Sequence, residues 1–192
     1  MALARGRVRI IGGQWRSRLL FFPEILDLRP TSDRIRETVF NWLGQDLSGL
    51  TCLDLFAGSG ALGFEAASRG AIHTVMIESD IQVFRALQEN KVKLQASQVE
   101  LIHANALSFL RSDTRRFDVI FLDPPFRLNL IPEVLPLLPL HLENNGLIYI
   151  ETQHAWRPEP RWRIMRNAKA GAVHYQLLEK KTDESSNLSG DV

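Results

Sequence analysis

The sequence Asp123-Pro124-Pro125-Phe126, directly after the almost wholly apolar run 117–122, combines residue types that could act on an amine of a nucleobase. Such an exocyclic amine is a poor nucleophile because ring conjugation delocalises its lone pair, so a site that alkylates it must accept its hydrogens and hold the base. The Asp123 carboxylate and the Pro124 carbonyl are acceptors, two prolines keep the backbone rigid, and Phe126 offers a stacking face. The alternative is a proline-terminated strand in which Asp123 is a turn residue and Phe126 belongs to the core.

A glycine-rich turn provides a second candidate site. Gly58, Gly60 and Gly63 fit the spacing G-x-G-x-x-G, which lets a chain turn tightly, approach a ligand with its backbone and pack the next helix on its strand. An apolar segment precedes the turn, an Ala-rich segment follows it, and Glu78 ends the next apolar run about twenty residues further on. This context predicts a site for a nucleotide-like cofactor, with Glu78 on a ribose.

Asp54, just before the turn, distinguishes between two cofactors that share this arrangement. A nicotinamide dinucleotide places its pyrophosphate at the start of the helix, and a carboxylate there would repel it. S-adenosylmethionine instead carries an ammonium and a sulfonium, so an acid in this place favours it. Asp54 could also be a carboxylate at the edge of the core that backbone amides satisfy.

Strands and helices alternate along the chain in a way that would place both motifs at one edge of a sheet. The predicted strands cover 50–56, 73–77, 99–103, 117–122 and 146–151, and the predicted helices cover 61–69, 81–94 and 106–110. A proline-interrupted helical stretch around 131–142 and a terminal pair of strands, 161–166 and 173–178, complete the pattern. We therefore expect an α/β fold with a doubly wound sheet whose last part turns antiparallel.

Arginines crowd the N-terminal residues, with no acidic residue before Glu24. Apolar residues on both sides of Gly12-Gly13 predict a β-hairpin over 7–22 that closes near these glycines. Arginine meets phosphate and Trp15 can stack on a base, so one interpretation is an RNA-contacting arm; the other is a solvated basic strand pair that covers the domain. The arginines are Arg5, Arg7, Arg9, Arg16 and Arg18.

A helix is predicted between this arm and the first strand of the sheet. Thr31 or Ser32 can cap its start, and it should run to about Leu47 with one apolar face. Three arginines lie in or beside its first turn, where cations oppose the helix dipole. These residues are Arg29, Arg34 and Arg36. Their placement indicates a role outside the helix, although plain surface residues would also fit.

Composition narrows the class of protein. With 192 residues, 45% hydrophobic and 23% charged, the chain has room for one α/β domain with small additions and is neither collagen-like, coiled-coil nor disordered. A single cysteine, Cys52, cannot form an intramolecular disulfide, which favours a reducing cytoplasm. No apolar run has the length of a signal peptide or a membrane span, so we expect a cytoplasmic protein. The histidines lack ligand spacing, so no metal site is predicted.

Several stretches together resemble a known family of enzymes. Asp-Pro-Pro-Phe after Asp54-x-Phe-x-Gly-x-Gly is similar to the class I amino-methyltransferases that act on nucleic acid bases. More narrowly, the stretches 9–19, 28–43 and 54–66 resemble the RsmD family, the bacterial 16S rRNA (guanine(966)-N(2))-methyltransferases. The run Arg-Pro-Thr-Ser-Asp-Arg-Ile-Arg-Glu-Thr at 29–38 is specific to that family, and the similarity extends from about Arg9 to Glu179.

The resemblance implies a role for each matching residue. Asp54 and the glycine turn would wrap the methionine part of S-adenosylmethionine, Glu78 would hold the ribose, and Asn105-Ala106 would border the adenine. The implied cofactor-binding residues are Asp54, Phe56, Gly58, Gly60, Glu78, Asn105, Ala106 and Asp123, and the implied catalytic residues, which hold the guanine, are Asp123, Pro124, Pro125 and Phe126. The RNA-binding set is Arg7, Arg9, Trp15, Arg16, Arg18, Arg29, Thr31 and Arg34. The family commonly has aspartate where this chain has Asn105, and a neutral oxygen accepts from the adenine amine more weakly than a charged one.

The implied fold is that of a class I S-adenosylmethionine-dependent methyltransferase, Rossmann-like, with a mostly parallel seven-stranded sheet and an antiparallel last strand. We expect a basic hairpin arm at 1–22, the methyltransferase domain at 23–179 and a disordered tail at 180–192. The implied reaction is transfer of a methyl group to the N2 amine of guanine 966 in 16S rRNA. The implied partner is that RNA within a 30S subunit or an assembly intermediate, and a monomer is the default state.

Four alternatives stay open on the sequence. An N6-adenine DNA methyltransferase uses similar Asp-Pro-Pro motifs, although 192 residues leave no room for a target-recognition domain, and another rRNA base could be the target. A non-catalytic RNA-binding or ribosome-assembly module could keep the fold, but intact Asp123 and Gly58 argue against such decay. A nicotinamide dehydrogenase conflicts with Asp54 for the reason given above.

Overall fold

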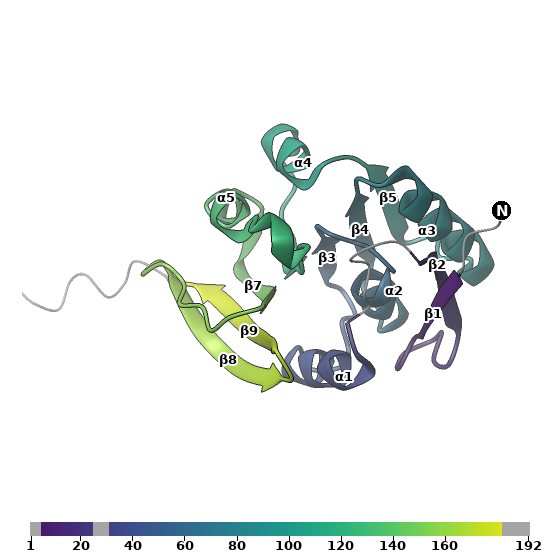
Figure 1. Ribbon diagram of the computed structural model, residues 1–192, viewed down its shortest axis with the longest axis horizontal. Helices are drawn as coiled ribbons and strands as arrows, with labels where there is room; N and C mark the ends of the chain where they lie inside the picture. Colours follow the sequence, from purple (N-terminus) through teal and green to yellow (C-terminus); the bar gives the residue numbers. More distant parts are fainter. Residues whose placement is uncertain (1–4, 25–30, 182–192) are drawn as a thin grey trace, which may run out of the picture.

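The computed structural model describes residues 5–24 and 31–181, which form a seven-stranded sheet, a two-stranded hairpin and the helices that cover the large sheet (Figure 1). The strands are β1 (Arg5–Arg9), β2 (Leu19–Pro23), β3 (Thr51–Asp54), β4 (His73–Glu78), β5 (Val99–His103), β6 (Phe117–Leu122), β7 (Leu142–Thr152), β8 (Trp162–Ala170) and β9 (Val173–Lys180). The helices are α1 (Asp33–Trp42), α2 (Ala61–Ser68), α3 (Ile81–Leu94), α4 (Ala106–Ser112) and α5 (Ile131–Val134), with 3-10 turns η1 (Phe126–Leu128) and η2 (Leu138–Leu140). None of the helices in these ranges is long and apolar enough to cross a membrane.

The large sheet has the strand order β5-β4-β3-β6-β7-β9-β8. β3 pairs in parallel with β4 and β6, and the pairs β4–β5 and β6–β7 are parallel too. Strand β9 runs against its neighbours, because it pairs antiparallel with both β7 and β8. The expected mostly parallel, seven-stranded sheet with an antiparallel last strand is therefore confirmed. The strand order reverses beside β3, and open α/β sheets bind ligands at such a switch point, beyond the carboxyl ends of the strands.

Helices on both faces explain why the central strands are mostly apolar. On one face, Leu53 of β3 and Ile120 of β6 pack with α4 and α5. On the other face, Phe121 of β6 packs with α1, and Met76 of β4 packs with α2 and α3. Strands covered on both faces have no polar alternation, which is why the run 117–122 is hydrophobic except at Asp118.

The predicted N-terminal hairpin is confirmed. Strands β1 and β2 pair antiparallel from Arg5 opposite Pro23 to Arg9 opposite Leu19. The hairpin lies against α3 (Figure 1), where the Asn90 amide donates to the Phe21 carbonyl at 2.8 Å and accepts from the Phe21 N–H at 3.1 Å. The side-chain amide of Asn90 on α3 thus forms the two hydrogen bonds with the backbone of Phe21 that a neighbouring strand would otherwise form with β2.

The hairpin loop, residues 10–18, is wider than the predicted closure at Gly12-Gly13, because it docks on α2. Gly13 has a φ of 74°, and a Cβ there would lie 1.8 Å from the Ser68 carbonyl oxygen. Glu65, also on α2, accepts from the N–H groups of Ile11 at 2.7 Å and Gly12 at 2.8 Å. The loop therefore follows the surface of the helix that begins at the glycine turn.

Helix α1 is shorter than predicted. It begins after Ser32, whose hydroxyl caps it as expected, but it ends at Trp42 rather than near Leu47. Gly44 and Gln45 have φ angles of 94° and 64°, and two left-handed residues in succession stop a helix. The segment that follows, up to Leu47, is not helical, and it buries the Leu47 side chain.

Strand β7 begins earlier than the predicted start at Gly146. It starts at Leu142, and the three residues between them, 143–145, are exposed. The register between β6 and β7 shifts in this part of the pairing. An exposed, polar and irregular beginning gives no apolar pattern, so sequence periodicity does not detect it.

Candidate active site

The acidic residues predicted for the site lie at the carboxyl ends of neighbouring strands. Asp54 is the last residue of β3, Glu78 is the last residue of β4, and Asp123 directly follows β6. Because β3 lies between β4 and β6, the three residues share one edge of the sheet. The structure therefore brings the glycine turn and the Asp-Pro-Pro-Phe motif together where open α/β sheets bind ligands.

The turn between β3 and α2 needs its glycines for two different reasons. Gly58 and Gly60 have φ angles of 50° and 79°, a region that side chains disfavour. A Cβ on Gly63 would lie 2.7 Å from the Met76 sulfur, so this glycine allows α2 to pack closely on β4. The turn thus places the N-terminus of α2 at the edge of the sheet where the acids lie.

Asp54 is buried behind this turn. Its Oδ2 accepts from the Gly63 N–H at 3.0 Å, and the carboxylate also accepts from the backbone N–H of Phe56. These bonds agree with a carboxylate satisfied by backbone amides, but they do not offset desolvation, because burial raises the pKa of Asp54 to about 7. The ionised carboxylate would gain stability from a positive charge beside it.

Glu78 connects the turn to β4. Its Oε2 accepts from the Gly58 N–H at 3.0 Å, and its Oε1 accepts from the Asp80 N–H at 2.7 Å. Burial raises the pKa of this carboxyl against the effect of those bonds. Each carboxylate oxygen has a further lone pair, so Glu78 can accept from ribose hydroxyls while it holds the turn.

The Asp-Pro-Pro-Phe motif forms a rigid corner after β6. The Thr31 hydroxyl donates to Asp123 Oδ2 at 3.2 Å, and burial raises the pKa of Asp123 to about 6 against this bond. Pro124 is buried, and the Pro125 carbonyl accepts from the Leu128 N–H at 2.9 Å, which forms the turn η1. Phe126 begins η1 and is 38% exposed, so it is not the core aromatic of the alternative interpretation.

Sequence reasoning missed a second buried acid beside Asp123. Glu151 lies near the end of β7, is 3% exposed and accepts from the Tyr149 hydroxyl at 2.7 Å. Burial, followed by the charge of Asp123, raises the pKa of Glu151 to about 8. The signal that could have found it is the position itself, since Glu151 ends the apolar run of the strand after the Asp-Pro-Pro-Phe motif.

Asn105 has a structural task that the sequence did not reveal. It is the N-cap of α4, and its side-chain oxygen accepts from the N–H groups of Leu107 at 2.9 Å and Ser108 at 3.4 Å. An aspartate in this place would have a second oxygen for the adenine amine, but asparagine has only a donor nitrogen left. Adenine contact by the Asn105 side chain stays a prediction, and it would compete with the helix cap. Ala106, the first residue of α4, is buried.

The residues predicted to bind RNA differ in how exposed they are. Exposed side chains among them are Arg7, Arg9, Arg16, Arg18 and Arg34. Arg9 is paired with Asp33 of α1 at 2.7 Å, and Trp15 is half-buried against the core beneath the hairpin. Arg29 lies outside the described residues, as does the side chain of Arg5. RNA contact by this set stays a prediction.

Arg36, which was expected to act outside its helix, lies in the interior. It donates to the Thr31 carbonyl at 3.1 Å, to Glu65 Oε2 at 3.2 Å and to the Arg9 carbonyl at 2.9 Å. It also pairs with Asp33 at 2.6 Å. The cation at the start of α1 therefore connects this helix to the hairpin and to α2.

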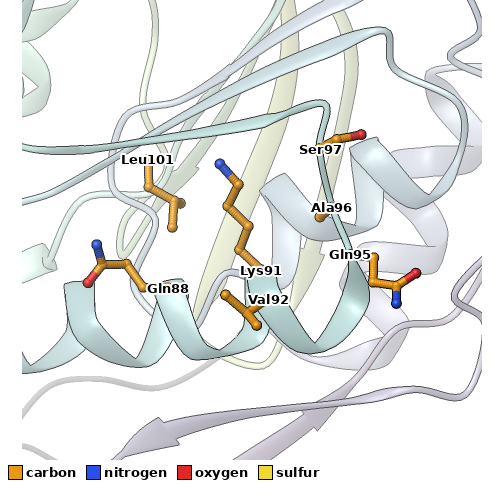
Figure 2. A pocket seen from close by; sticks show the side chains of 7 residues that line it. All are labelled: Gln88, Lys91, Val92, Gln95, Ala96, Ser97 and Leu101. Carbon is orange, nitrogen blue, oxygen red and sulfur yellow. The ribbon is translucent and has the colours of Figure 1, made fainter.

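A hollow of about 570 Å³ is lined by residues of α3, of β5 and of the turn between them (Figure 2). Lys91 and Val92 from α3 and Leu101 from β5 line it, together with Gln88 and the turn 95–97. It contains none of the predicted site residues. The hollow lies beside the edge strand β5, and none of its lining residues comes from the carboxyl ends of β3, β4 or β6.

Electrostatics indicate what the strand ends can bind. Asp54, Glu78 and Asp123 are all carboxyls whose pKa is raised mainly by burial, so each is held without sufficient compensation of its negative charge. Within residues 5–24 and 31–181, no three His, Cys, Asp or Glu side chains are grouped closely enough to hold a metal ion. An organic cation with hydroxyl groups fits this set of acceptors.

Comparison of the sequence with known proteins found a protein family and related proteins. Residues 8–179 match the model of a protein family described as Conserved hypothetical protein 95. The chain is 42% identical over 187 residues to the Ribosomal RNA small subunit methyltransferase D of Escherichia coli (strain K12), a match that covers 95% of this chain and 94% of the relative.

Solved structures share the fold. The yhhF protein of Escherichia coli superposes with a TM-score of 0.83 at 43% identity, over 92% of this chain and 99% of that one. The Thermus thermophilus 16S rRNA N2 G1207 methyltransferase (RsmC), in complex with AdoMet and guanosine, superposes with a TM-score of 0.73 over 94% of this chain and 52% of that one. At 21% identity, the second likeness shows the fold alone, and it agrees with the α/β methyltransferase fold that the sequence predicts.

Proposed function

The chain belongs to the family described as Conserved hypothetical protein 95, the RsmD family, and on that premise we propose that it transfers a methyl group from S-adenosylmethionine to the exocyclic N2 amine of a guanine in 16S rRNA. The relative in Escherichia coli carries the name of a small-subunit ribosomal RNA methyltransferase. The neighbour from Thermus thermophilus, solved with AdoMet and guanosine, supports the view that this fold can hold both ligands together.

One observation carries the proposal: the two motifs lie on adjacent strands. β3 and β6 are directly paired, with Asp54 opposite Phe121, two residues before Asp123. A ligand over the glycine turn would therefore lie beside the Asp-Pro-Pro-Phe corner. This is the arrangement that a transfer between a cofactor and a base requires, because the reacting atoms must approach within van der Waals distance.

The residues present fit S-adenosylmethionine. Asp54 and the glycine turn would hold the cationic methionine part, and Glu78 would hold the ribose hydroxyls. A positive charge at the carboxyl ends of these strands would stabilise the ionised forms of Asp54 and Asp123 and so lower their pKa values, which burial raises to about 7 and about 6. The cofactor supplies a methyl group on a sulfonium, which an amine lone pair can attack directly.

The chain's own part in the reaction is to orient the amine and to accept its hydrogens. Asp123 would accept one N2 hydrogen and then take the proton that the amine loses when it gains the methyl group, so the base leaves neutral. Because its pKa is about 6, Asp123 is mostly ionised near neutral pH and can do both. Phe126 would stack on the base, and the buried Pro124 would keep the corner rigid.

The substrate particle and the arm are further parts of the proposal. We propose that residues 1–22 form an RNA-contacting arm on a catalytic domain at 23–179. We further propose that the substrate is 16S rRNA in a 30S subunit or an assembly intermediate, and that the enzyme acts on it as a monomer in the cytoplasm. The exposed arginines of the hairpin and its loop support this, since they can meet phosphates. So small a domain has few side chains to recognise a base sequence, which favours a composite RNA–protein surface.

The test is methyl transfer from labelled S-adenosylmethionine to 30S subunits, naked 16S rRNA, 23S rRNA and duplex DNA, followed by mass spectrometry of the nucleosides. We expect N2-methylguanosine in 16S rRNA, with the larger yield on the particle. N6-methyladenine in DNA would identify the rival enzyme. Calorimetry that detects no S-adenosylmethionine binding would favour a non-catalytic RNA-binding module.

A further inference from the structure

A buried guanidinium connects the N-terminal hairpin to the carboxyl of Asp123 through direct hydrogen bonds. Arg36 lies near the start of α1, and its side chain is completely buried. Towards the hairpin, it donates to the Arg9 carbonyl at 2.9 Å and pairs with Glu65 at 3.2 Å. Glu65 in turn accepts from two backbone N–H groups of the hairpin loop, at 2.7 and 2.8 Å. Arg36 is thus attached to the hairpin both directly and through α2.

The same guanidinium holds the backbone beside Asp123. Its Nε donates to the Thr31 carbonyl at 3.1 Å, and the Thr31 hydroxyl donates to Asp123 Oδ2 at 3.2 Å. Thr31 precedes Ser32, the N-cap of α1, and is 8% exposed. A threonine side chain has few rotamers, so a bond that fixes the Thr31 backbone also limits where its hydroxyl can lie. The contacts run in the order hairpin loop, Glu65, Arg36, Thr31, Asp123.

Arginine is the residue type that this arrangement needs. A guanidinium is planar and carries five N–H donors in a rigid fork. Its three nitrogens here donate in three directions, to the Thr31 carbonyl, to Glu65, and to the Arg9 carbonyl together with Asp33. A lysine would keep the charge, but the donors of its single nitrogen cannot reproduce this fork. One side chain therefore fixes the hairpin, α2 and the Thr31 backbone relative to one another.

We propose that Arg36 is a positioning residue for methyl transfer, which holds the Thr31 hydroxyl against Asp123 and makes this contact depend on the docked hairpin. The inference rests on the proposed function of Asp123 as the acceptor for the target amine. With one carboxylate oxygen bonded to Thr31, the other faces the amine in one direction, and a displacement of about 1 Å can cost about a hundredfold in rate. The RNA-contacting arm and the Asp-Pro-Pro-Phe corner are thus connected through the interior of the protein.

The first test removes the Thr31 hydroxyl and measures the turnover number on 30S particles. Thr31→Val keeps the shape of the side chain and should lower kcat about 10- to 100-fold, with little change in the KM for S-adenosylmethionine. Thr31→Ser keeps the hydroxyl and should stay within about threefold of wild type. Wild-type kcat in Thr31→Val overturns the inference.

The matched control for this test is Thr152→Val. Thr152 lies at the end of β7, is 9% exposed, and its hydroxyl donates to the His154 carbonyl at 2.8 Å, outside the chain of contacts. The variant loses a similar buried hydrogen bond, so its kcat should equal that of wild type. A loss in Thr152→Val as large as in Thr31→Val would show that the effect is not specific, and it overturns the inference.

The second test separates Arg36 from an ion pair that only stabilises the fold. Arg69 shares the Glu65 carboxylate at 2.8 Å with a side chain that is 7% exposed, and its guanidinium lies over the Phe40 ring. Arg36→Lys should lower kcat about tenfold or more, whereas Arg69→Lys, which disturbs the same carboxylate, should stay within about twofold of wild type. Both are measured well below their melting temperatures. Equal values of kcat in the two variants overturn the inference.

A readout that does not need activity separates this inference from the proposed function. The pKa of Asp123 is about 6, and the hydrogen bond from Thr31 lowers it. In a ¹³C NMR titration of the aspartate carboxyl groups, the signal that Asp123→Asn removes should therefore titrate at a higher pH in Thr31→Val and in Arg36→Lys. In Arg69→Lys it should titrate as in wild type.

The titration isolates the lost contact, because the other groups that interact with Asp123 are intact in these variants. They are Asp54, Glu151 and Tyr149. Arg36→Lys also keeps the positive charge at its position. An unchanged pKa of Asp123 in Arg36→Lys refutes the link, whatever the activity. If the wild type methylates none of the RNA substrates, the proposed function fails, and the titration still decides whether Arg36 positions Asp123.

Discussion

Removal of the Glu65 carboxylate should destabilise the protein more than any exposed charge does. Glu65 lies on α2 with a fully buried side chain, and it accepts from Arg36 at 3.2 Å and from Arg69 at 2.8 Å. It also accepts from the backbone N–H groups of Ile11 and Gly12 in the hairpin loop. The substitution Glu65→Ala therefore removes this acceptor from two buried guanidinium groups, those of Arg36 and Arg69, and from two backbone N–H groups.

The expected magnitude follows from the burial of the pair. Loss of one partner of a buried ion pair costs about 3–5 kcal/mol, because the other charge stays in the interior. Arg36 keeps its bonds to Asp33 and to the Thr31 carbonyl, so we expect about 4 kcal/mol rather than more. For a domain of this size each kcal/mol lowers the melting temperature by about 2–4 °C, which gives a decrease of about 8–16 °C.

The assay is urea unfolding followed by circular dichroism, with Glu159→Ala as the control. Glu159 pairs with Arg161 at 3.1 Å, but both side chains are about half exposed, at 47% and 52%. Such a surface pair contributes within about 0.5 kcal/mol. If Glu65→Ala unfolds within about 1 kcal/mol of wild type, Glu65 does not hold the hairpin to α2 in the way described.

Three further predictions concern the loop, the cofactor acid and the stacking face. In urea titrations, Gly13→Ala should lower the free energy of unfolding by about 2 kcal/mol more than Gly171→Ala does. Both glycines have positive φ, but only a Cβ at position 13 would meet a backbone carbonyl. Equal losses in the two variants would refute this close approach. The pKa of Asp54 is raised to about 7, so its contribution to stability is complete below its unfolded pKa and is lost as pH rises through the folded pKa of about 7. Without ligand, urea unfolding should therefore show stability falling from about pH 4 to about pH 7, less so in Asp54→Asn, and parallel curves would contradict this. Phe126→Ala should raise the KM for RNA about 10- to 100-fold in methylation kinetics, because the exposed ring would stack on a base. The melting temperature should stay nearly constant. An unchanged KM would show that Phe126 does not contact the RNA.

The strand ends could be predicted from the sequence because local patterns determine them. Asp54, Glu78 and Asp123 each follow an apolar run, and such runs in an α/β chain are parallel strands whose carboxyl ends share an edge. The G-x-G-x-x-G spacing similarly predicts the turn, since positive φ at Gly58 and Gly60 is a local requirement.

The partners of buried charges could not be predicted, because they lie far apart in the chain. The Thr31 hydroxyl donates to Asp123, 92 residues further along the chain, only because the fold brings Thr31 to the end of β6. Arg36 donates to Glu65, which lies 29 residues further along the chain. A cation that opposes the dipole of α1 therefore forms a buried ion pair that joins α1 to α2. Composition and periodicity carry no information on such pairings.

Methyl transfer by Asp123→Ala, measured together with cofactor binding, tests the central claim most directly. The Asp123 carboxylate is expected to accept hydrogens of the target amine, and Asp54 and Glu78 are expected to provide most of the acidic contacts to S-adenosylmethionine. The variant should lose methylation of 16S rRNA by about a hundredfold or more, with calorimetric affinity for S-adenosylmethionine within about threefold of wild type. Full methylation by Asp123→Ala would contradict the account.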